Sequence, residues 1–232
     1  MKLWIGTSGF QYPEWKGAFY PESLPLSKML AFYAERFFTT EVNYSFRRIP
    51  SAKTISAWAA GTPANFRFSL KAPQKITHFA KLRDCGETVR YFHEVVGGLD
   101  EKLGAILFQL PPRFVKDAPL LLDFLEALPH GMRAAFEFRH ASWLTDDVFA
   151  LLKENNAALC IAENEDFATP RVATADFGYL RLRREDYAGA DIANWAGWIR
   201  EQENGWGEAF VYFKHEERGV GPKFAQRLIA AV

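Results

Sequence analysis

The sequence predicts an α/β fold, an irregular (β/α)8 barrel of the TIM-like kind formed by residues 1–232 as a single domain. Eight short segments rich in β-branched and aromatic residues alternate with helical patterns, and this alternation indicates a parallel sheet. The length of 232 residues suits eight such units in one domain, with a doubly wound open sheet as the alternative. No repeat, linker or low-complexity stretch argues for a second domain.

The strands are expected, in chain order, at residues 2–8, 40–46, 66–72, 104–110, 134–140, 158–164, 178–183 and 209–215. Helices are expected between most of them, at residues 27–37, 117–128, 145–156, 191–202 and 221–232. Ser27, Asp117 and Thr145 stand at the N-cap positions of the first three, and Pro119 suits a first helical turn. Residues 165–177 have the composition of a loop, so the barrel is expected to be irregular between its sixth and seventh strands.

Composition places the chain among globular proteins and predicts a soluble, cytoplasmic location. Hydrophobic residues make up 49% and charged residues 24% of the sequence. The 28 lysines and arginines balance the 28 aspartates and glutamates, so no overall field attracts nucleic acid or an anionic membrane. The stretch MKLWIGTSGF lacks the apolar core of a signal peptide, and no apolar run is long enough to span a membrane. Cys85 and Cys160 are expected to be free thiols.

The segment AAFEFRH, residues 134–140, combines a buried strand with opposite charges. Residues two apart share a face of a strand, so Phe136 and Phe138 point one way while Glu137 and Arg139 point the other. The aromatic face suits packing against helices, which leaves the charged face lining the barrel interior. This charged end is also the C-terminal end, where barrels of this kind carry their active sites.

The same alternation turns polar residues inward near the C-terminal ends of the other strands. These residues are Glu41, Asn43, Lys71, Gln109, Arg181, Arg183 and Lys214. Counted with the fifth strand, the inward set has five cations and two carboxylates. A structural network of ion pairs is expected to balance, because burying an unpaired charge is costly. The surplus of cations therefore favours a site for an anionic ligand.

Five stretches of the chain resemble the YecE-like family, known as domain of unknown function 72. They are IGTSGFQYPEWKGAFYPE, FFTTEVNYSFRRIPS, GTPANFRFSLKAPQKITH, LGAILFQLPPRF and FEFRHASW, in the order that the family has them. The resemblance covers nearly the whole chain. It implies a TIM-like barrel related in shape to the xylose-isomerase group, and it implies no assigned activity.

The resemblance also implies which residues belong to the family's polar signature. By position these are Thr7, Glu41, Asn43, Lys71, His78, Gln109, Glu137, Arg139, His140 and Trp143. The later half of the chain departs from the family. Relatives tend to have a histidine-glycine pair after the seventh strand and an asparagine-aspartate pair after the eighth, whereas this chain has RLRRED and FKHEERG. The chain is locally more basic there.

Three residues are candidates for catalysis. Glu137 is interpreted as a general acid or base, with Glu41 as the other carboxylate able to transfer a proton. Lys71 is expected either to form a Schiff base, if nearby cations depress its pKa, or to be a charge partner of Glu41 or Glu137. The alternative is that Glu137 and Arg139 form a structural pair that braces the barrel.

The remaining candidates are expected to bind substrate: Asn43, His78, Gln109, Arg139, Arg181, Arg183 and Lys214. His78 follows the third strand, where it is close enough for proton transfer, although a surface histidine has the same signature. Arg181, Arg183 and Lys214 fall where many barrels bind phosphate. The aromatic loop after the first strand, which includes Tyr12, is expected to stack on a sugar or base, to form a hydrophobic lid, or to pack as a mini-core that closes the barrel.

The sequence favours an enzyme that acts on a small anionic metabolite, phosphorylated or carboxylate, by acid–base chemistry of the lyase, isomerase or hydrolase type. The alternative is a non-catalytic protein that binds a small anion or a structured nucleic acid, and the neutral overall charge counts against nucleic acid. No cofactor is predicted. No metal is predicted either, because Lys71 and Arg139 among the carboxylates repel a cation. The oligomeric state is left open.

Overall fold

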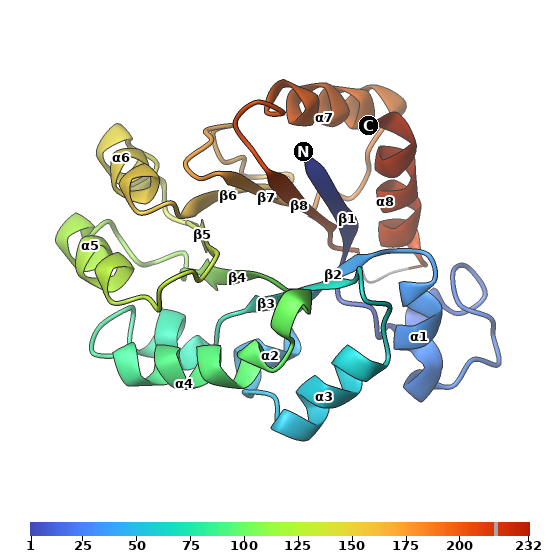
Figure 1. Cartoon of the computed structure of the whole chain (residues 1–232). Helices are drawn as coiled ribbons and strands as arrows, with labels where there is room; N and C mark the ends of the chain where they lie inside the picture. The colour runs from blue at the N-terminus through green and yellow to red at the C-terminus, as the bar shows by residue number, and fades with distance from the viewer. Residues whose placement is uncertain (216–217) are drawn as a thin grey trace.

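A computed structural model describes residues 1–215 and 218–232, and its centre is a closed barrel of eight parallel strands in the order β1 to β8 (Figure 1). The strands are β1 Lys2–Ser8, β2 Thr39–Val42, β3 Arg67–Lys71, β4 Leu103–Gln109, β5 Ala134–Glu137, β6 Ala158–Glu163, β7 Phe177–Leu182 and β8 Glu208–Phe213. The barrel closes where β1 pairs with β8 along most of its length. This is the predicted fold, and the open sheet is excluded.

Helices surround the barrel (Figure 1). They are α1 Met29–Ala34, α2 Tyr44–Arg47, α3 Ala52–Ala60, α4 Gly86–Gly97, α5 Ala118–Glu126, α6 Asp146–Glu154, α7 Gly189–Glu201 and α8 Val220–Ala231. The connection between β6 and β7 contains no helix, and a single bridge between Glu163 and Ala168 is its only strand-like pairing. The predicted irregularity after the sixth strand is therefore confirmed.

The N-terminal half differs from the expected elements in three places. The expected strand 40–46 ends at Val42, because the chain then closes into the single helical turn α2. Ser27 is not the N-cap of α1, which begins at Met29 after a short 3-10 turn. Helices α3 and α4 were not predicted, although Ser51 caps α3 by accepting a hydrogen bond from the backbone amide of Thr54.

The fifth strand is also shorter than expected. It ends at Glu137 rather than at residue 140, because its pairing with β6 stops at Phe136. His140 instead caps a 3-10 turn, its Nδ1 accepting from the amide of Ser142 at 3.2 Å. Arg139 therefore lies in a loop just beyond the strand end.

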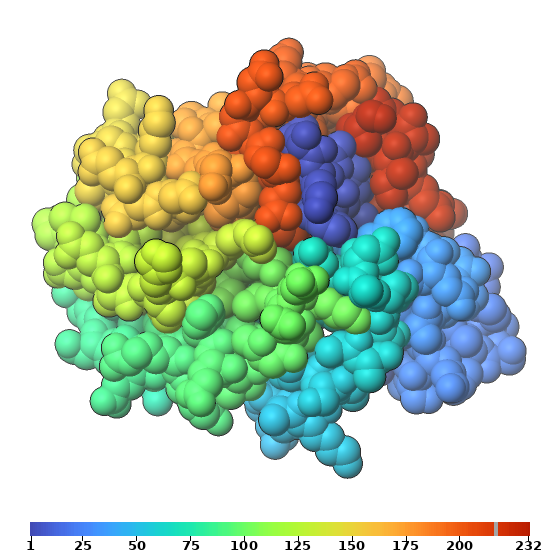
Figure 2. Space-filling model, viewed as in Figure 1, coloured from blue at the N-terminus to red at the C-terminus, as the bar shows by residue number. Residues whose placement is uncertain are grey.

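The core has two layers, as expected for a barrel ringed by helices. Outward-facing strand residues pack against the helices, and the barrel interior is filled by rings such as Trp4, Tyr179, Phe210 and Tyr212. Figure 2 shows the first residues of the chain, in dark blue, beside α8 in dark red.

Cys160 and Cys85 are both buried and free, as predicted. Among the described residues, no helix combines the length and the apolar character needed to cross a bilayer.

The interior changes from apolar to polar toward the C-terminal strand ends. The strand register sets Ser8 beside Glu41 and Gln109 beside Glu137. Each of these four side chains is buried. The inward orientation that strand alternation predicted is thus confirmed for the strand residues, and it concentrates polar groups at one end of the barrel.

Candidate functional site

A single guanidinium group joins the two interior carboxylates. Arg181 on β7 is only 2% exposed, and Glu41 on β2 and Glu137 on β5 are equally buried, at 0% and 1%. The Nη2 of Arg181 donates to Oε1 of Glu41 at 2.8 Å, and its Nε donates to the same oxygen at 3.2 Å. Its Nη1 donates to Oε2 of Glu137. We call these three side chains the buried triad.

Hydroxyl groups complete the surroundings of Glu41. Tyr179 donates to Oε2 at 2.7 Å, and the hydroxyl of Ser8 donates to Oε1. Burial alone raises the pKa of the Glu41 carboxyl, but Arg181 and the two hydroxyls outweigh burial and hold that pKa below its usual range. Asn43 extends the network outward, because its Nδ2 donates to Oγ of Ser8 at 2.8 Å.

Three arginines converge on Glu137. Arg139 donates through Nε to Oε1 at 2.7 Å, and Arg183 approaches the same oxygen through Nη2 at 3.4 Å. Burial raises the pKa of Glu137, yet Arg181, Arg139 and Arg183 together hold it well below its usual range. A carboxyl that stays ionised is a poor proton donor at neutral pH. The acid–base role of Glu137 stays a prediction, and the geometry favours a fixed counter-charge.

Lys71, at the end of β3, has a different environment. Its Nζ donates to Oε1 of Gln109 at 2.6 Å and lies 4.0 Å from the centre of the Phe46 ring. Among the described residues, no carboxylate oxygen lies within 4 Å of this Nζ. Arg181 contacts both carboxylates instead, so Lys71 is a charge partner of Glu41 and Glu137 only at longer range, through the attraction that partly raises its pKa.

Without a carboxylate in direct contact, the ammonium group of Lys71 has a lowered pKa. Burial lowers the pKa of its ammonium group first, the positive charge of Arg181 lowers it further, and the more distant Glu137 and Glu41 only partly compensate. The resulting pKa is about 8. The side chain is only partly buried, so a neutral amine is available to a ligand near physiological pH.

We expect the labelling rate of Lys71 by an amine-reactive acylating reagent to rise with pH to a midpoint of about 8. An ordinary lysine has a pKa of about 10.4, so at pH 7.5 the neutral fraction of Lys71 is about 200-fold larger. Mass spectrometry of the digested protein after labelling between pH 6 and 10 measures the midpoint, with the exposed lysines as internal reference. A midpoint near 10.4 contradicts the expectation.

His78 joins this cluster through an aromatic ring. It lies in a π-helical turn, Lys75–Phe79, and its ring packs edge-on against Phe46 with the centres 4.9 Å apart. Burial lowers the pKa of His78, and the charges of Lys71 and Arg139 lower it further. Its imidazole is therefore neutral at pH 7, across the Phe46 ring from a lysine that loses its proton readily. Phe46 thus separates Lys71 from His78.

Arg183 and Lys214 follow the ends of β7 and β8. The Nε of Arg183 is buried and has no hydrogen-bond partner among the described residues, which is unusual for a buried donor. The backbone amide of Lys214 donates to the carbonyl oxygen of Leu182 at 3.1 Å, so it starts from the same rim of the barrel. The hydrogen bonds named above for the buried triad do not include Lys214, which has an interaction of its own.

Three residues of the polar signature have structural roles. Thr7 donates to the carbonyl oxygen of Gly9 at 2.6 Å, and the indole of Trp143 donates to the carbonyl oxygen of Phe114 at 2.7 Å. His140 forms the turn cap already described. These contacts shape the loops at the barrel mouth and stand apart from the buried triad.

Sequence reasoning missed Ser8, Phe46 and Tyr179. The signal for Tyr179 was present, because it shares the inward parity of Arg181 on β7, and Ser8 lies at the end of β1 as Glu41 lies near the end of β2. Phe46 had no such signal, because it was expected in a strand and on the outward face. Its contact with Lys71 exists only because α2 turns the chain back toward β3.

The charges at the strand ends do not cancel. Lys71, Arg139, Arg181 and Arg183 provide four positive charges, and Glu41 and Glu137 provide two negative ones, which leaves two in excess. This count omits Lys214, which has an interaction of its own. No group of three or more histidine, cysteine, aspartate or glutamate side chains is placed to hold a metal ion in the described ranges.

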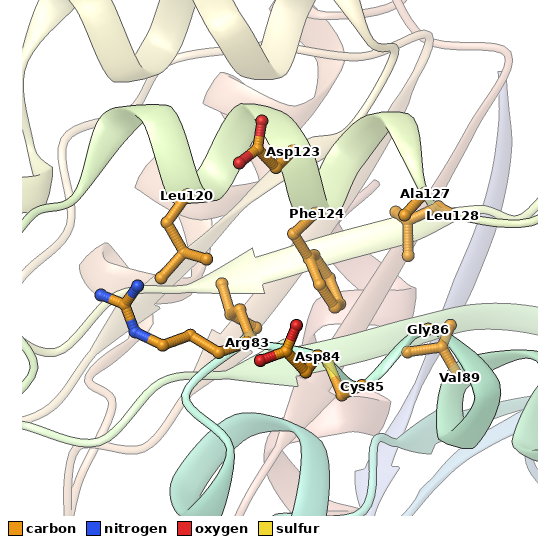
Figure 3. Close-up of a pocket in the computed structure, with 11 residues that line it drawn as sticks. Arg83, Asp84, Cys85, Gly86, Val89, Leu120, Asp123, Phe124, Ala127 and Leu128 are labelled. Carbon is orange, nitrogen blue, oxygen red and sulfur yellow. The ribbon is translucent and has the colours of Figure 1, made fainter.

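The described residues form cavities outside this network as well. One, of about 340 Å³, lies on the outside of the barrel between the start of α4 and α5. Figure 3 shows the ring of Phe124 and the side chain of Asp84 at its wall. None of the predicted site residues lines it. A second cavity, of about 320 Å³, is lined by Asn43 and adjoins the strand ends.

A family model described as "Protein of unknown function DUF72" matches residues 4–232. The UPF0759 protein YecE of Escherichia coli strain K12 is 30% identical over 139 residues, which are 60% of this chain and 48% of that protein. The UPF0759 protein YunF of Bacillus subtilis strain 168 is 27% identical over 157 residues, 62% of this chain and 52% of that protein. The chain spans about half the length of these curated relatives.

Solved structures share the fold. A DUF72 family protein of Thermotoga maritima superimposes with a TM-score of 0.85 at 23% identity, covering 99% of this chain and 98% of that chain. A DUF72 family protein of Enterococcus faecalis gives a TM-score of 0.81 at 19% identity, with coverages of 99% and 94%. At these identities the likeness concerns the barrel alone. The family model, which matches all but the first three residues, shows that the chain belongs to the DUF72 family of proteins of unknown function.

Proposed function

We propose that the protein is an enzyme that binds a small anionic metabolite at the C-terminal strand ends and uses Lys71 to move a proton. The observation that carries the proposal is the position of Lys71, which lies beside Gln109, without a carboxylate partner and with a pKa of about 8. Lysines with a depressed pKa in a partly open site are typical general bases and nucleophiles.

Arg139 and Arg183 are the proposed anion-binding groups. Both contact Glu137 with only part of their donors, and Arg183 keeps a buried Nε without a partner among the described residues. A phosphate or carboxylate oxygen would accept from these donors. Arg139 also reaches Oε1 of Gln109, at 3.4 Å, the atom that binds Lys71. An anion held by Arg139 thus lies within reach of the lysine.

The buried triad is proposed to position these groups rather than to react. Glu137 orients Arg139 and Arg183, and Arg181 fixes Glu137 in turn. In the proposed step, the neutral amine of Lys71 accepts a proton from a carbon next to a carbonyl or carboxylate. The electron pair moves to the oxygen, where Arg139 stabilises the enolate, and the ammonium returns the proton to carbon.

A thermal-shift screen of sugar phosphates and organic acids tests the binding part of the proposal. A ligand at about 100 times its Kd stabilises by roughly 2.7 kcal/mol, which raises the Tm of a domain of this size by roughly 5–11 °C. Arg139→Ala should abolish the shift. Arg36→Ala is the matched control, because Arg36 forms an exposed pair with Glu35 far from this network. A screen in which no anion stabilises the protein refutes the proposal.

The catalytic part needs a different measurement. For an anion that binds, exchange of its carbon-bound hydrogen with D₂O is followed by NMR. Lys71→Met should stop the exchange while the anion still binds. Binding without exchange in the wild type would instead support the non-catalytic alternative, a binding protein for a small anion.

A further inference from the structure

The cavity beside Asn43 has a lining unlike that of the strand ends. Its volume is about 320 Å³, and it lies between the loop after β1, the end of β2 and α3. Four of the lining residues are aromatic: Phe10, Tyr12, Tyr44 and Trp58. Two more, Gln11 and Asn43, carry side-chain amides, and none of the residues that line it is charged. We call this cavity the aromatic pocket.

The aromatic pocket adjoins the ion network directly. Asn43 lines the pocket and donates to Ser8, which donates in turn to Glu41 of the buried triad. Helix α2 connects the pocket with Lys71. Tyr44 lines the pocket, whereas Phe46, two residues on and so on the opposite side of a helical turn, covers Nζ of Lys71.

Two further features shape the pocket wall. Gly9 has a φ of +96°, and a Cβ on it would lie only 2.4 Å from the hydroxyl oxygen of Tyr12, so glycine lets this ring approach the backbone closely. Tyr12 is held by a hydrogen bond from its hydroxyl to the carbonyl oxygen of Ser8 at 2.8 Å. Tyr44, in contrast, is 52% exposed and offers its ring face at the rim.

We propose that the aromatic pocket binds the base of a nucleoside monophosphate whose phosphate lies on Arg139 and Arg183. This inference rests on the anion site of the proposed function and names the rest of the ligand. Aromatic faces stack on any base, and side-chain amides match the donors and acceptors along a base edge. A lining without charge suits a neutral base. The cations proposed to hold the phosphate follow β5 and β7, each three strands from β2 around the closed barrel.

Isothermal titration with AMP, UMP and ribose 5-phosphate tests the inference. The two nucleotides should bind at least about tenfold more tightly than ribose 5-phosphate, because one base stack contributes about that factor. Tyr44→Ala should remove most of this advantage and leave the affinity for ribose 5-phosphate unchanged. Tyr91→Ala is the matched control, since Tyr91 is a 58% exposed tyrosine on α4 that does not line the pocket.

The outcomes separate the two sites. Equal affinity for all three phosphates overturns the base pocket and leaves the anion site standing. Binding of adenosine as tight as that of AMP, lost in Tyr44→Ala, keeps the base pocket and refutes the anion site. If neither the nucleotides nor adenosine bind, the inference is wrong.

Discussion

Arg181→Met is expected to lower the free energy of unfolding by at least about 3–5 kcal/mol, because removal of one partner from a buried ion pair leaves an uncompensated charge. Here one guanidinium serves two carboxylates, Glu41 and Glu137, and all three side chains are at most 2% exposed. Urea unfolding at pH 7 followed by circular dichroism measures the loss. Thermal unfolding should show a Tm lower by roughly 6–20 °C for a domain of this size.

The pH dependence distinguishes this cause from loss of packing. In the wild type the pKa values of Glu41 and Glu137 are depressed, so their contribution to stability is present above about pH 4.5 and is lost as the pH falls below it. In Arg181→Met the carboxylate of Glu41 loses its cation, so burial raises its pKa and protonation at acid pH removes the unpaired charge, whereas Glu137 keeps Arg139 and Arg183. The stability difference should therefore shrink between pH 7 and pH 4. A difference independent of pH would assign the loss to packing.

A surface arginine provides the control for that comparison. Arg36→Met removes an exposed pair with Glu35, and such pairs contribute at most about 1 kcal/mol. Its effect should be small at every pH. If the two variants behave alike, the buried triad contributes no more than an exposed ion pair.

The fold was predictable because it depends on patterns that extend along the whole chain. The alternation of strands and helices identified the barrel, and the period of two placed Glu41, Gln109, Glu137 and Arg181 inward. The irregular connection after β6 was visible as a missing helical pattern. Strand ends were less predictable, because the chain leaves β2 after Val42 for reasons of local hydrogen bonding that no periodicity records.

The sequence predicted which residues lie at the strand ends, but it did not predict which of them form ion pairs with one another. Strand alternation gives the direction of a side chain, whereas the choice of ionic partner depends on which strands face one another across a closed barrel. Glu137 and Arg139 share a face of the predicted strand, and the structure adds Arg181 as a larger influence than Arg139 on the same carboxylate. Lys71, which the sequence offers as a catalytic residue or a charge partner, contacts the amide of Gln109 rather than a carboxylate. The aromatic pocket depends on α2, which was expected as strand.

Glu137→Gln is expected to destabilise the protein by about 3–5 kcal/mol at pH 7, because three arginines lose the charge that they share. Arg139, Arg181 and Arg183 all donate to this carboxylate. The amide also replaces one acceptor oxygen with a donor that faces other donors. Urea unfolding measures the loss, with Glu126→Gln as the control, since Glu126 is exposed on α5.

Inorganic phosphate then tests whether these arginines form an anion site. In Glu137→Gln the cations lack their counter-charge, so a phosphate ion should bind more tightly than in the wild type and raise the Tm of the variant by more. The extra stabilisation should disappear when Arg139→Ala is added, because Arg139 is the most exposed of the three guanidinium groups. Equal phosphate shifts in wild type and variant would mean that the arginines serve only to hold the barrel together. A larger shift in the variant would mean that Glu137 neutralises, in the unliganded protein, the same arginines that a bound anion would neutralise.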